Sequence, residues 1–290
     1  MVENLHHNLP LSRNARIAAN GLQTKIERDE LELPLLPGVA ADVLALVENK
    51  DSDAMALAKL VQSDQALAVH VMRIANSAHY SPSVPLVSLQ QAIARLGMTL
   101  ISEIALAASI STKTFSAPGY EHLIRQMWQH ALASALWSKE IARKVRKNVE
   151  ATFLCGLLHQ IGRPVVLQAI VDLIEVYQLE LTEKDIKALI DAYHQTMGSK
   201  VARHWKLPES VIEAINFTQN YNAAPTAKHL AMIVWAGNRF ASLMMNDGSI
   251  TRGELFSLPV ITDLNLYEDE VEALLEAAPG IQSAVEVLLV

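Results

Sequence analysis

Cysteine is almost absent from this chain of 290 residues, which contains only Cys155. A single cysteine excludes a disulfide within the chain, and this is typical of proteins from a reducing compartment. Aromatic residues are also scarce at 5%, although hydrophobic residues as a whole make up 51%. Because sandwiches and barrels favour aromatic and β-branched residues, this balance favours a core of packed helices.

Long apolar segments and excess positive charge are missing too. The longest apolar stretch, TLISEIALAASIS at 99–111, carries Glu103 and is too short to span a bilayer. The first twenty residues have no apolar core of a signal peptide. A net charge of −7 argues against nucleic acid as the main partner. The sequence therefore indicates a soluble, cytoplasmic protein that neither enters a membrane nor binds DNA.

Helical periodicity begins near Leu33 and continues to the end of the chain. In the first such segment, four apolar residues share one helix face: Val39, Val43, Leu46 and Val47. Side chains that can cap a helix stand where several of the later segments begin, namely in DSD at 51–53, at Asp64, Ser88 and Thr99, and at Thr182 or a nearby residue. No strand alternation of convincing length is present, so the sequence predicts an all-α protein.

The clearest internal break is SAPGY at 116–120. We therefore expect an N-terminal arm at 1–30, which is loose or partly helical, and an N-terminal helical lobe at 31–116. A second helical lobe at 117–246 and a C-terminal helical extension at 247–290, made of two short helices, complete the prediction. A junction between lobes is a common place for a ligand or partner to bind.

Three histidines lie on separate predicted helices: His130, His159 and His194. His159 interrupts the apolar run FLCGLLHQIG, which predicts a short, central helix. A histidine on an apolar helix is most often a core residue with a hydrogen-bond partner. Several histidines on inward faces also fit a metal site, so both interpretations stay open.

Five segments together resemble, in this order, the blocks of the HDOD domain: LPLLPGVAADVLALV, LAKLVQSDQALAVHVMRIANSAHY, VSLQQAIARLGMTLI, FLCGLLHQIG and HQTMGSKVARHWKLPESVIEAI. The resemblance covers about residues 30–240. It implies an all-helical relative of the HD phosphohydrolases, with 117–246 as the HD-like lobe. It also implies a role in bacterial signalling or regulation, commonly without a complete metal site.

In HD enzymes the metal ligands are a histidine, a His-Asp pair and a distant aspartate. The resemblance matches His130 to the first histidine and His159 to the histidine of the pair. Gln160 stands where the paired aspartate belongs, and Asn238 falls where the distant aspartate would lie. His194 matches an additional histidine of some HD relatives. These five residues form the degenerate HD pocket that the resemblance implies, and we expect the three histidines to converge in space.

The two amides decide what this pocket can do. A divalent metal ion in such a site needs anionic oxygen ligands, whereas an amide is neutral and cannot act as a base. We therefore expect no catalytic residue and no cofactor, although two imidazoles could hold a divalent metal weakly. The sequence predicts a non-catalytic module that acts through protein partners in a signalling pathway, with room for a small-molecule or nucleotide ligand. The alternative is a metal-dependent phosphohydrolase of nucleotides or phosphoesters.

Overall fold

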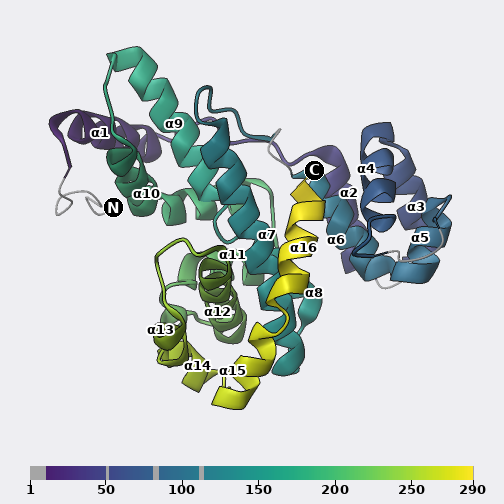
Figure 1. Ribbon diagram of the computed structural model, residues 1–290. Helices are drawn as coiled ribbons and strands as arrows, with labels where there is room; N and C mark the ends of the chain where they lie inside the picture. The colour runs from purple at the N-terminus through teal and green to yellow at the C-terminus, as the bar shows by residue number, and fades with distance from the viewer. Residues whose placement is uncertain (1–10, 50–51, 81–84, 111–113, 290) are drawn as a thin grey trace. The chain divides into compact units, whose positions relative to one another are not determined.

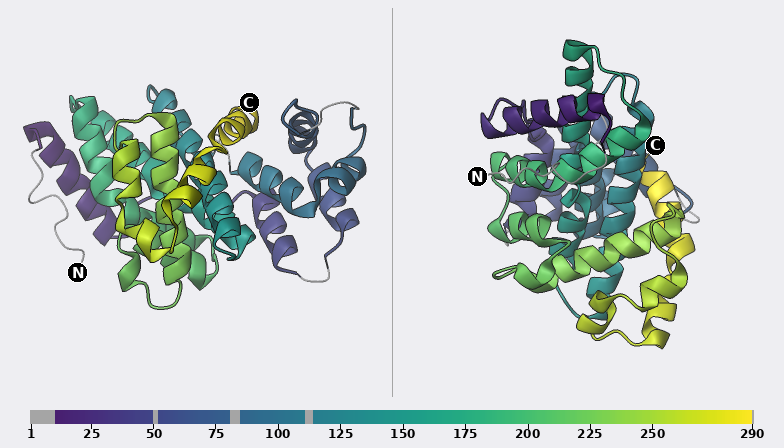
Figure 2. Two further views of the ribbon diagram at one scale, coloured as in Figure 1. Left: turned by 60° about the horizontal axis from the view of Figure 1, so that its bottom comes forward. Right: turned by 90° about the vertical axis from the view of Figure 1, so that its left-hand side faces the viewer.

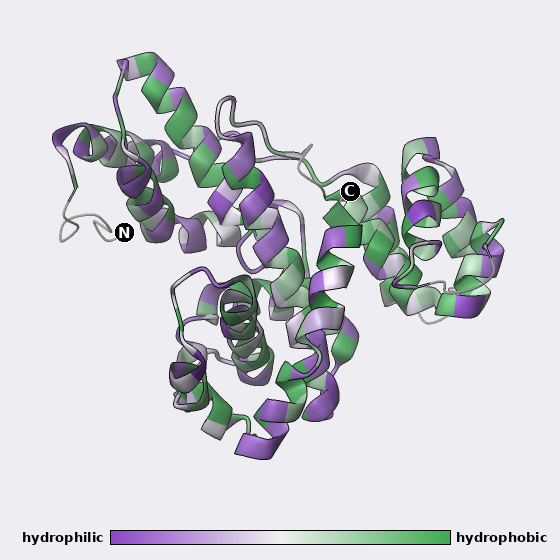
Figure 3. Cartoon of the chain, in the orientation of Figure 1, coloured by the Kyte–Doolittle hydropathy of each residue, from purple (hydrophilic) through white to green (hydrophobic). Residues whose placement is uncertain are grey.

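The structure is a computed structural model that describes residues 11–49, 52–80, 85–110 and 114–289 (Figure 1). These residues form helices and the loops between them, and none of them lies in a strand. The all-α fold predicted from the sequence is therefore confirmed. Hydrophobic and hydrophilic residues alternate along the helices in Figure 3, as expected for helices that bury one face in a core.

The described chain forms two compact units that are each assembled from separate stretches. The first unit contains the described residues up to Leu35, together with Phe115–Trp128 and Leu158–Ala231. The second contains the described residues of Leu36–Thr114, Gln129–Leu157 and Met232–Val290. Three helices contribute residues to both units: α7 (Glu121–Lys144), α8 (Val149–Leu158) and α12 (Lys228–Met245). The contiguous ranges 31–116, 117–246 and 247–290 stay predictions.

The first unit is built around a pair of helices and the N-terminal helix that covers them. Its elements are α1 (Arg13–Glu27), α9 (Gly162–Tyr177), α10 (Glu183–His204), α11 (Glu209–Phe217) and the short 3₁₀ helix η2 (Tyr221–Ala223). Helices α9 and α10 pack along each other, and α1 packs against both. Both views of Figure 2 show α1, in purple, beside the teal and green helices of this unit.

The sequence predicted an arm that is loose or partly helical, and the structure shows helix α1 held along its length. Ser12 caps the helix, and its hydroxyl donates a hydrogen bond to Asp185 of α10. The hydroxyl of Tyr193 donates to the backbone carbonyl of Ala19. Beyond the other end of the helix, Asp29 pairs with Lys200. The arm is therefore part of the core from residue 13 onward, whereas its residues 1–10 lie outside the described part of the chain.

The second unit contains the remaining helices. They are α2 (Gly38–Glu48), α3 (Ala54–Gln62), α4 (Gln65–Ala75), α5 (Leu89–Leu96), α6 (Met98–Ser109), α13 (Arg252–Phe256), α14 (Pro259–Asp263), α15 (Glu268–Leu275) and α16 (Ala278–Leu289). Helix α6 is central, because α2, α4 and α16 all pack against it. The C-terminal extension ends in α13 to α16 rather than in two short helices, so that expectation was wrong.

Local capping chemistry explains most of the helix boundaries. The predicted caps Asp53, Asp64 and Thr182 each accept a hydrogen bond from the first turn of their helix. The prediction that Thr99 caps a helix was wrong, because α6 already begins at Met98. Gly97 makes this early start possible, since its φ of 87° reverses the chain directly between α5 and α6.

One stretch, Val149–Tyr177, is long and apolar enough to cross a membrane by length and composition alone. In the protein, 72% of its most apolar window is buried, and a turn separates its two helices, α8 and α9. The bent pair α5 and α6 passes the same test only if both helices count as one span. Such burial is typical of core helices.

Candidate functional site

In the first unit, the turn between α8 and α9 carries His159 and Gln160. His159 is buried, and it lies just after α8 rather than inside a helix as its apolar neighbours suggested. Gly162 explains how this turn meets α10. A Cβ atom at Gly162 would lie 1.9 Å from the backbone oxygen of His194. The turn that carries His159 and Gln160 therefore leads into a backbone contact between Gly162 and α10 at His194, which only glycine permits.

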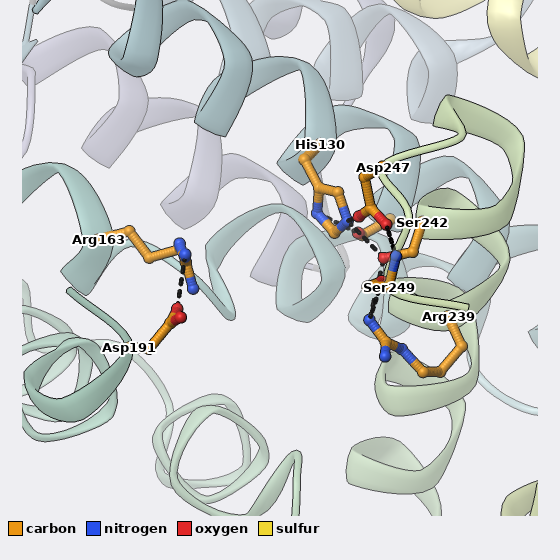
Figure 4. A network of polar contacts seen from close by, with 8 residues as sticks. His130, Arg163, Asp191, Arg239, Ser242, Asp247 and Ser249 are labelled. Atoms are coloured by element: carbon orange, nitrogen blue, oxygen red, sulfur yellow. Dashed lines mark hydrogen bonds and ion pairs between the residues drawn. The ribbon is translucent and has the colours of Figure 1, made fainter. Parts of the chain in front are cut away.

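The surroundings of His194 disfavour a positive charge on its ring. Arg163, in the first turn of α9, pairs with Asp191 at 2.8 Å (Figure 4). Burial, followed by the charge of Arg163, lowers the pKa of His194 to about 4 against the opposing effect of Asp191. His194 is therefore neutral near pH 7. Its Nδ1 atom is buried and has no hydrogen-bond partner among the described residues.

The shifted pKa of His194 predicts a loss of stability in acid. An unfolded chain binds a proton near the ordinary histidine value of 6.5, whereas the folded protein binds one only near 4. The unfolded state thus takes up more protons in this window, and stability falls as pH drops from about 6.5 to about 4. The loss is about 3 kcal/mol at 1.36 kcal/mol per pKa unit. Urea unfolding of His194→Gln and of the unchanged protein across this range measures it.

The matched control is His204→Asn, which changes an exposed histidine of the same helix. We expect His194→Gln to remove most of the acid-dependent loss, and His204→Asn to retain it. Equal pH slopes for all three proteins would contradict the assignment of this loss to His194.

In the second unit, His130 on α7 and Asn238 on α12 are positioned by a close helix crossing. A Cβ atom at Gly237 would lie 2.3 Å from Ser138 Oγ and 2.9 Å from the backbone oxygen of Ser134. Ser134 and Ser138 follow His130 on α7 by four and eight residues. The glycine beside Asn238 therefore lets α12 approach α7 closely. Asn238 itself is buried, at 4% exposure.

Both ring nitrogens of His130 are used in hydrogen bonds. Nε2 lies 3.1 Å from the Ser242 hydroxyl, and Nδ1 lies 3.3 Å from the Ser134 hydroxyl. Ser242 also accepts a hydrogen bond from Arg239 at 3.0 Å and donates its own proton to Asp247. Since Ser242 accepts from Arg239 and donates to Asp247, the Nε2–H group of His130 donates to Ser242. Both ring nitrogens of His130 therefore lie within hydrogen-bond distance of a serine hydroxyl, which leaves neither open to a metal.

Asp247 is a member of this network that sequence reasoning missed. It lies in the loop after α12, and its Oδ2 atom is 3.9 Å from His130 Nε2 (Figure 4). Burial acts to raise the pKa of its carboxyl. Hydrogen bonds from Ser249 and Ser242, together with His130, more than offset this effect and hold the pKa below its ordinary value. Asp247 is therefore ionised, and it brings a carboxylate to His130 although position 238 holds an amide.

Serine, histidine and aspartate in one network invite comparison with a nucleophilic triad. The geometry does not match one, because Ser242 and Asp247 both approach the Nε2 side of His130. A triad needs the aspartate on the other ring nitrogen. Ser242 is also only 1% exposed and donates its proton to Asp247 rather than to a base on His130, so its hydroxyl is not arranged as a nucleophile.

The donors described here do not fit the divalent metal of HD enzymes. Gln160 and Asn238 are neutral, both nitrogens of His130 are engaged, and His194 lies within the field of Arg163. Within the described residues, no group of three or more His, Cys, Asp or Glu side chains is placed to hold a metal. Convergence of His130 with His159 and His194 would join the two units, and it stays a prediction, as does the lack of a tightly bound metal.

Comparison with solved structures supports the fold. A candidate metal-dependent phosphohydrolase from Shewanella amazonensis SB2B is 21% identical, with a TM-score of 0.73 over 94% of this chain and 100% of that chain. An HDOD domain protein with unknown function from Geobacter sulfurreducens is 22% identical, with a TM-score of 0.72 over 95% of this chain and 98% of its own. A candidate signal transduction protein from Marinobacter aquaeolei VT8 is 21% identical, with a TM-score of 0.68. The match covers 99% of this chain and 69% of that chain.

Comparison with sequences places the chain in a family. It is 24% identical over 203 residues to an uncharacterized protein of Treponema pallidum (strain Nichols), a match that covers 67% of this chain. The chain spans only 39% of the length of that relative. The model of the HDOD domain matches residues 33–221, which is more than half of the chain. The chain therefore belongs to the HDOD domain family.

Proposed function

We propose that this chain is a non-catalytic HDOD module, which acts in a bacterial signalling or regulatory pathway through contacts with protein partners. The observation that carries the proposal is Gln160, a neutral amide that follows His159 where a hydrolase of the wider superfamily needs a carboxylate. The single cysteine, Cys155, is buried as a free thiol, which supports a cytoplasmic setting.

The charges around the candidate residues support the same proposal. In the first unit Arg163 is paired with Asp191, and in the second Asp247 lies in one network with Arg239. Each group thus contains one cation and one anion, with no excess negative charge to offset a divalent metal. Without such a metal, no group described here would activate the water that attacks a phosphoester.

The first test is metal binding and turnover. Protein purified without chelator should contain no stoichiometric transition metal after dialysis, and it should not hydrolyse a chromogenic phosphodiester with added manganese. Gln160→Asp together with Asn238→Asp restores two anionic oxygens, and we expect manganese to bind at least tenfold more tightly, which corresponds to about 1.4 kcal/mol. Calorimetry measures both affinities.

The charge-matched control is Gln62→Asp with Asn265→Asp, two exposed amides in α3 and in the loop before α15. This control should leave manganese affinity unchanged, which separates restored ligands from a more negative protein. A metal that survives dialysis of the unchanged protein, together with phosphodiesterase activity, would establish the phosphohydrolase alternative instead.

A second arm of this test addresses the partner. Charge reversals at the exposed residues Arg73 and Arg125 should weaken capture of a native partner and the cellular phenotype. His159→Ala, in a stably folded protein, should preserve both. The opposite pattern, in which only His159→Ala abolishes the phenotype, would place the function in the pocket and overturn the partner role.

A further inference from the structure

Four donor groups of the second unit surround one carboxylate of the chain itself. The groups are the imidazole of His130, the guanidinium of Arg239 and the hydroxyls of Ser242 and Ser249, and the carboxylate is that of Asp247. We call these five residues the Asp247 cluster (Figure 4). We infer that the Asp247 cluster is a binding site for a small carboxylate or phosphate anion, in which Asp247 acts as an internal ligand.

The guanidinium of Arg239 is held in place within the cluster, and one of its N–H donors is unused. Its guanidinium lies 5.0 Å from the ring centre of Trp235, and one terminal nitrogen donates to both Ser242 and Ser249. Its Nε atom is buried and has no hydrogen-bond partner within the part of the chain described. A planar guanidinium with unused donor capacity is suited to a carboxylate or a phosphate.

Asp247 occupies this site without filling it. Its carboxylate accepts hydrogen bonds from the Ser249 backbone at 2.8 Å and from the Ser242 hydroxyl. The distance of 3.9 Å to His130 is longer than a direct hydrogen bond. The side chain is also 35% exposed, whereas that of His130 is only 15% exposed. An anion from solution could therefore replace Asp247 at the outer side of donors that are already in place.

The loop that carries Asp247 is suited to such a replacement. It is short and polar, and it turns through two left-handed residues, Asn246 with φ 51° and Gly248 with φ 77°. Besides two backbone hydrogen bonds, from Asn246 to Leu243 and from Asp247 to Ser242, its turn is stabilised by the side-chain contacts of Asp247 and Ser249. Loss of these contacts on anion binding would release the loop that leads into α13. This inference goes beyond the proposed partner role and does not depend on it.

Asp247→Asn tests the inference, because it removes the competing charge while it keeps the shape of the side chain. A site that is occupied by an internal ligand binds an external one more weakly, in proportion to the fraction of time it is free. We therefore expect Asp247→Asn to bind inorganic phosphate or acetate at least tenfold more tightly than the unchanged protein. Calorimetry at low salt, with each anion in a separate titration, identifies the class.

Three further variants make the test decisive. Asp269→Asn is the matched control, since it makes the same change at an exposed aspartate of α15 outside the cluster. Adding Arg239→Gln or the milder Ser249→Ala to Asp247→Asn should lower the gained affinity, with circular dichroism to verify folding. If Asp247→Asn binds neither anion more tightly than Asp269→Asn does, or if both added substitutions leave the gain intact, the inference is overturned. Metal and partner measurements on the unchanged protein are unaffected by that outcome.

Discussion

Replacing Lys139 with methionine is expected to reduce the free energy of unfolding by about 3–5 kcal/mol, the usual loss when one partner of a buried ion pair is removed. Lys139 on α7 pairs with Glu103 on α6, and both side chains are only 8% exposed. Lys139 also lies 5.8 Å from the ring centre of Phe153. Lys139 binds the Oε2 atom of Glu103, and the Oε1 atom has no hydrogen-bond partner among the described residues. The substitution would therefore leave a buried carboxylate without its cation.

The pH dependence of this loss has a definite sign. Burial raises the pKa of Glu103, although Lys139 opposes the shift. Without Lys139 the pKa would rise further, so the folded protein would bind a proton more readily than the unfolded chain. The variant should therefore regain stability as pH falls from 7 towards 5, relative to the unchanged protein. Urea unfolding at both pH values measures this difference.

Two controls belong to this prediction. Lys144→Met makes the same change on the same helix, but the pair of Lys144 with Glu270 is about one-third exposed and should contribute less than about 1 kcal/mol. Combining Lys139→Met with Glu103→Leu should restore most of the stability, because no unpaired charge remains buried. A Lys139→Met protein as stable as Lys144→Met would show that the buried pair contributes little.

The second large effect is expected at Gly162. In the Gly162→Ala variant the new methyl carbon would lie 1.9 Å from the His194 oxygen and 2.4 Å from the Gly198 nitrogen. Both neighbours are backbone atoms, so no side chain can rotate away, and α9 would have to move from α10. Overpacking of side chains usually costs 1–3 kcal/mol, and we expect about 4 kcal/mol or more here. Thermal unfolding and the yield of soluble protein measure the loss.

A graded glycine series separates this contact from the general effect of glycine in a helix. Gly253 in α13 has no atom within 4 Å of its added Cβ, so Gly253→Ala should stabilise the protein by up to about 1 kcal/mol. At Gly198 the nearest atom is a side-chain methyl of Ile215 at 3.2 Å, so its loss should be intermediate. Equal stabilities across the series would mean that α9 and α10 approach less closely than described.

The fold could be predicted largely from local chemistry. Apolar spacing identified the helices, and aspartate or threonine identified starts such as that of α10, because a side-chain oxygen satisfies free backbone N–H groups there. The start of α6 could not be predicted from Thr99, since a glycine backbone angle rather than a capping side chain decides it. The C-terminal extension was underestimated because α13 and α14 have only five residues each, too few for a periodic pattern.

The candidate site was only partly visible in the sequence. The substitution of Gln160 for a carboxylate can be read directly beside His159, since the two are adjacent. Asp247 gave no such signal, because it lies in NDGS, which has the composition of an ordinary loop. Its partner His130 is also 117 residues earlier in the sequence. Only folding brings Asp247 to His130, and only hydrogen-bond accounting shows that both nitrogens of this histidine are used.

Helix α1 belongs to the packed core of the first unit, although it lies outside the stretch that matches the family model. The stretch by which the family is recognised begins at residue 33, yet α1 buries Leu22 and Ile26 completely or nearly so, well before that point. Tyr193 reaches the backbone of residue 19 rather than its side chain, so that contact places no demand on residue identity. A fragment that begins at residue 33 would therefore expose to water the surfaces of α9 and α10 that α1 covers. The stretch that identifies the family is thus shorter than the hydrophobic core to which it belongs.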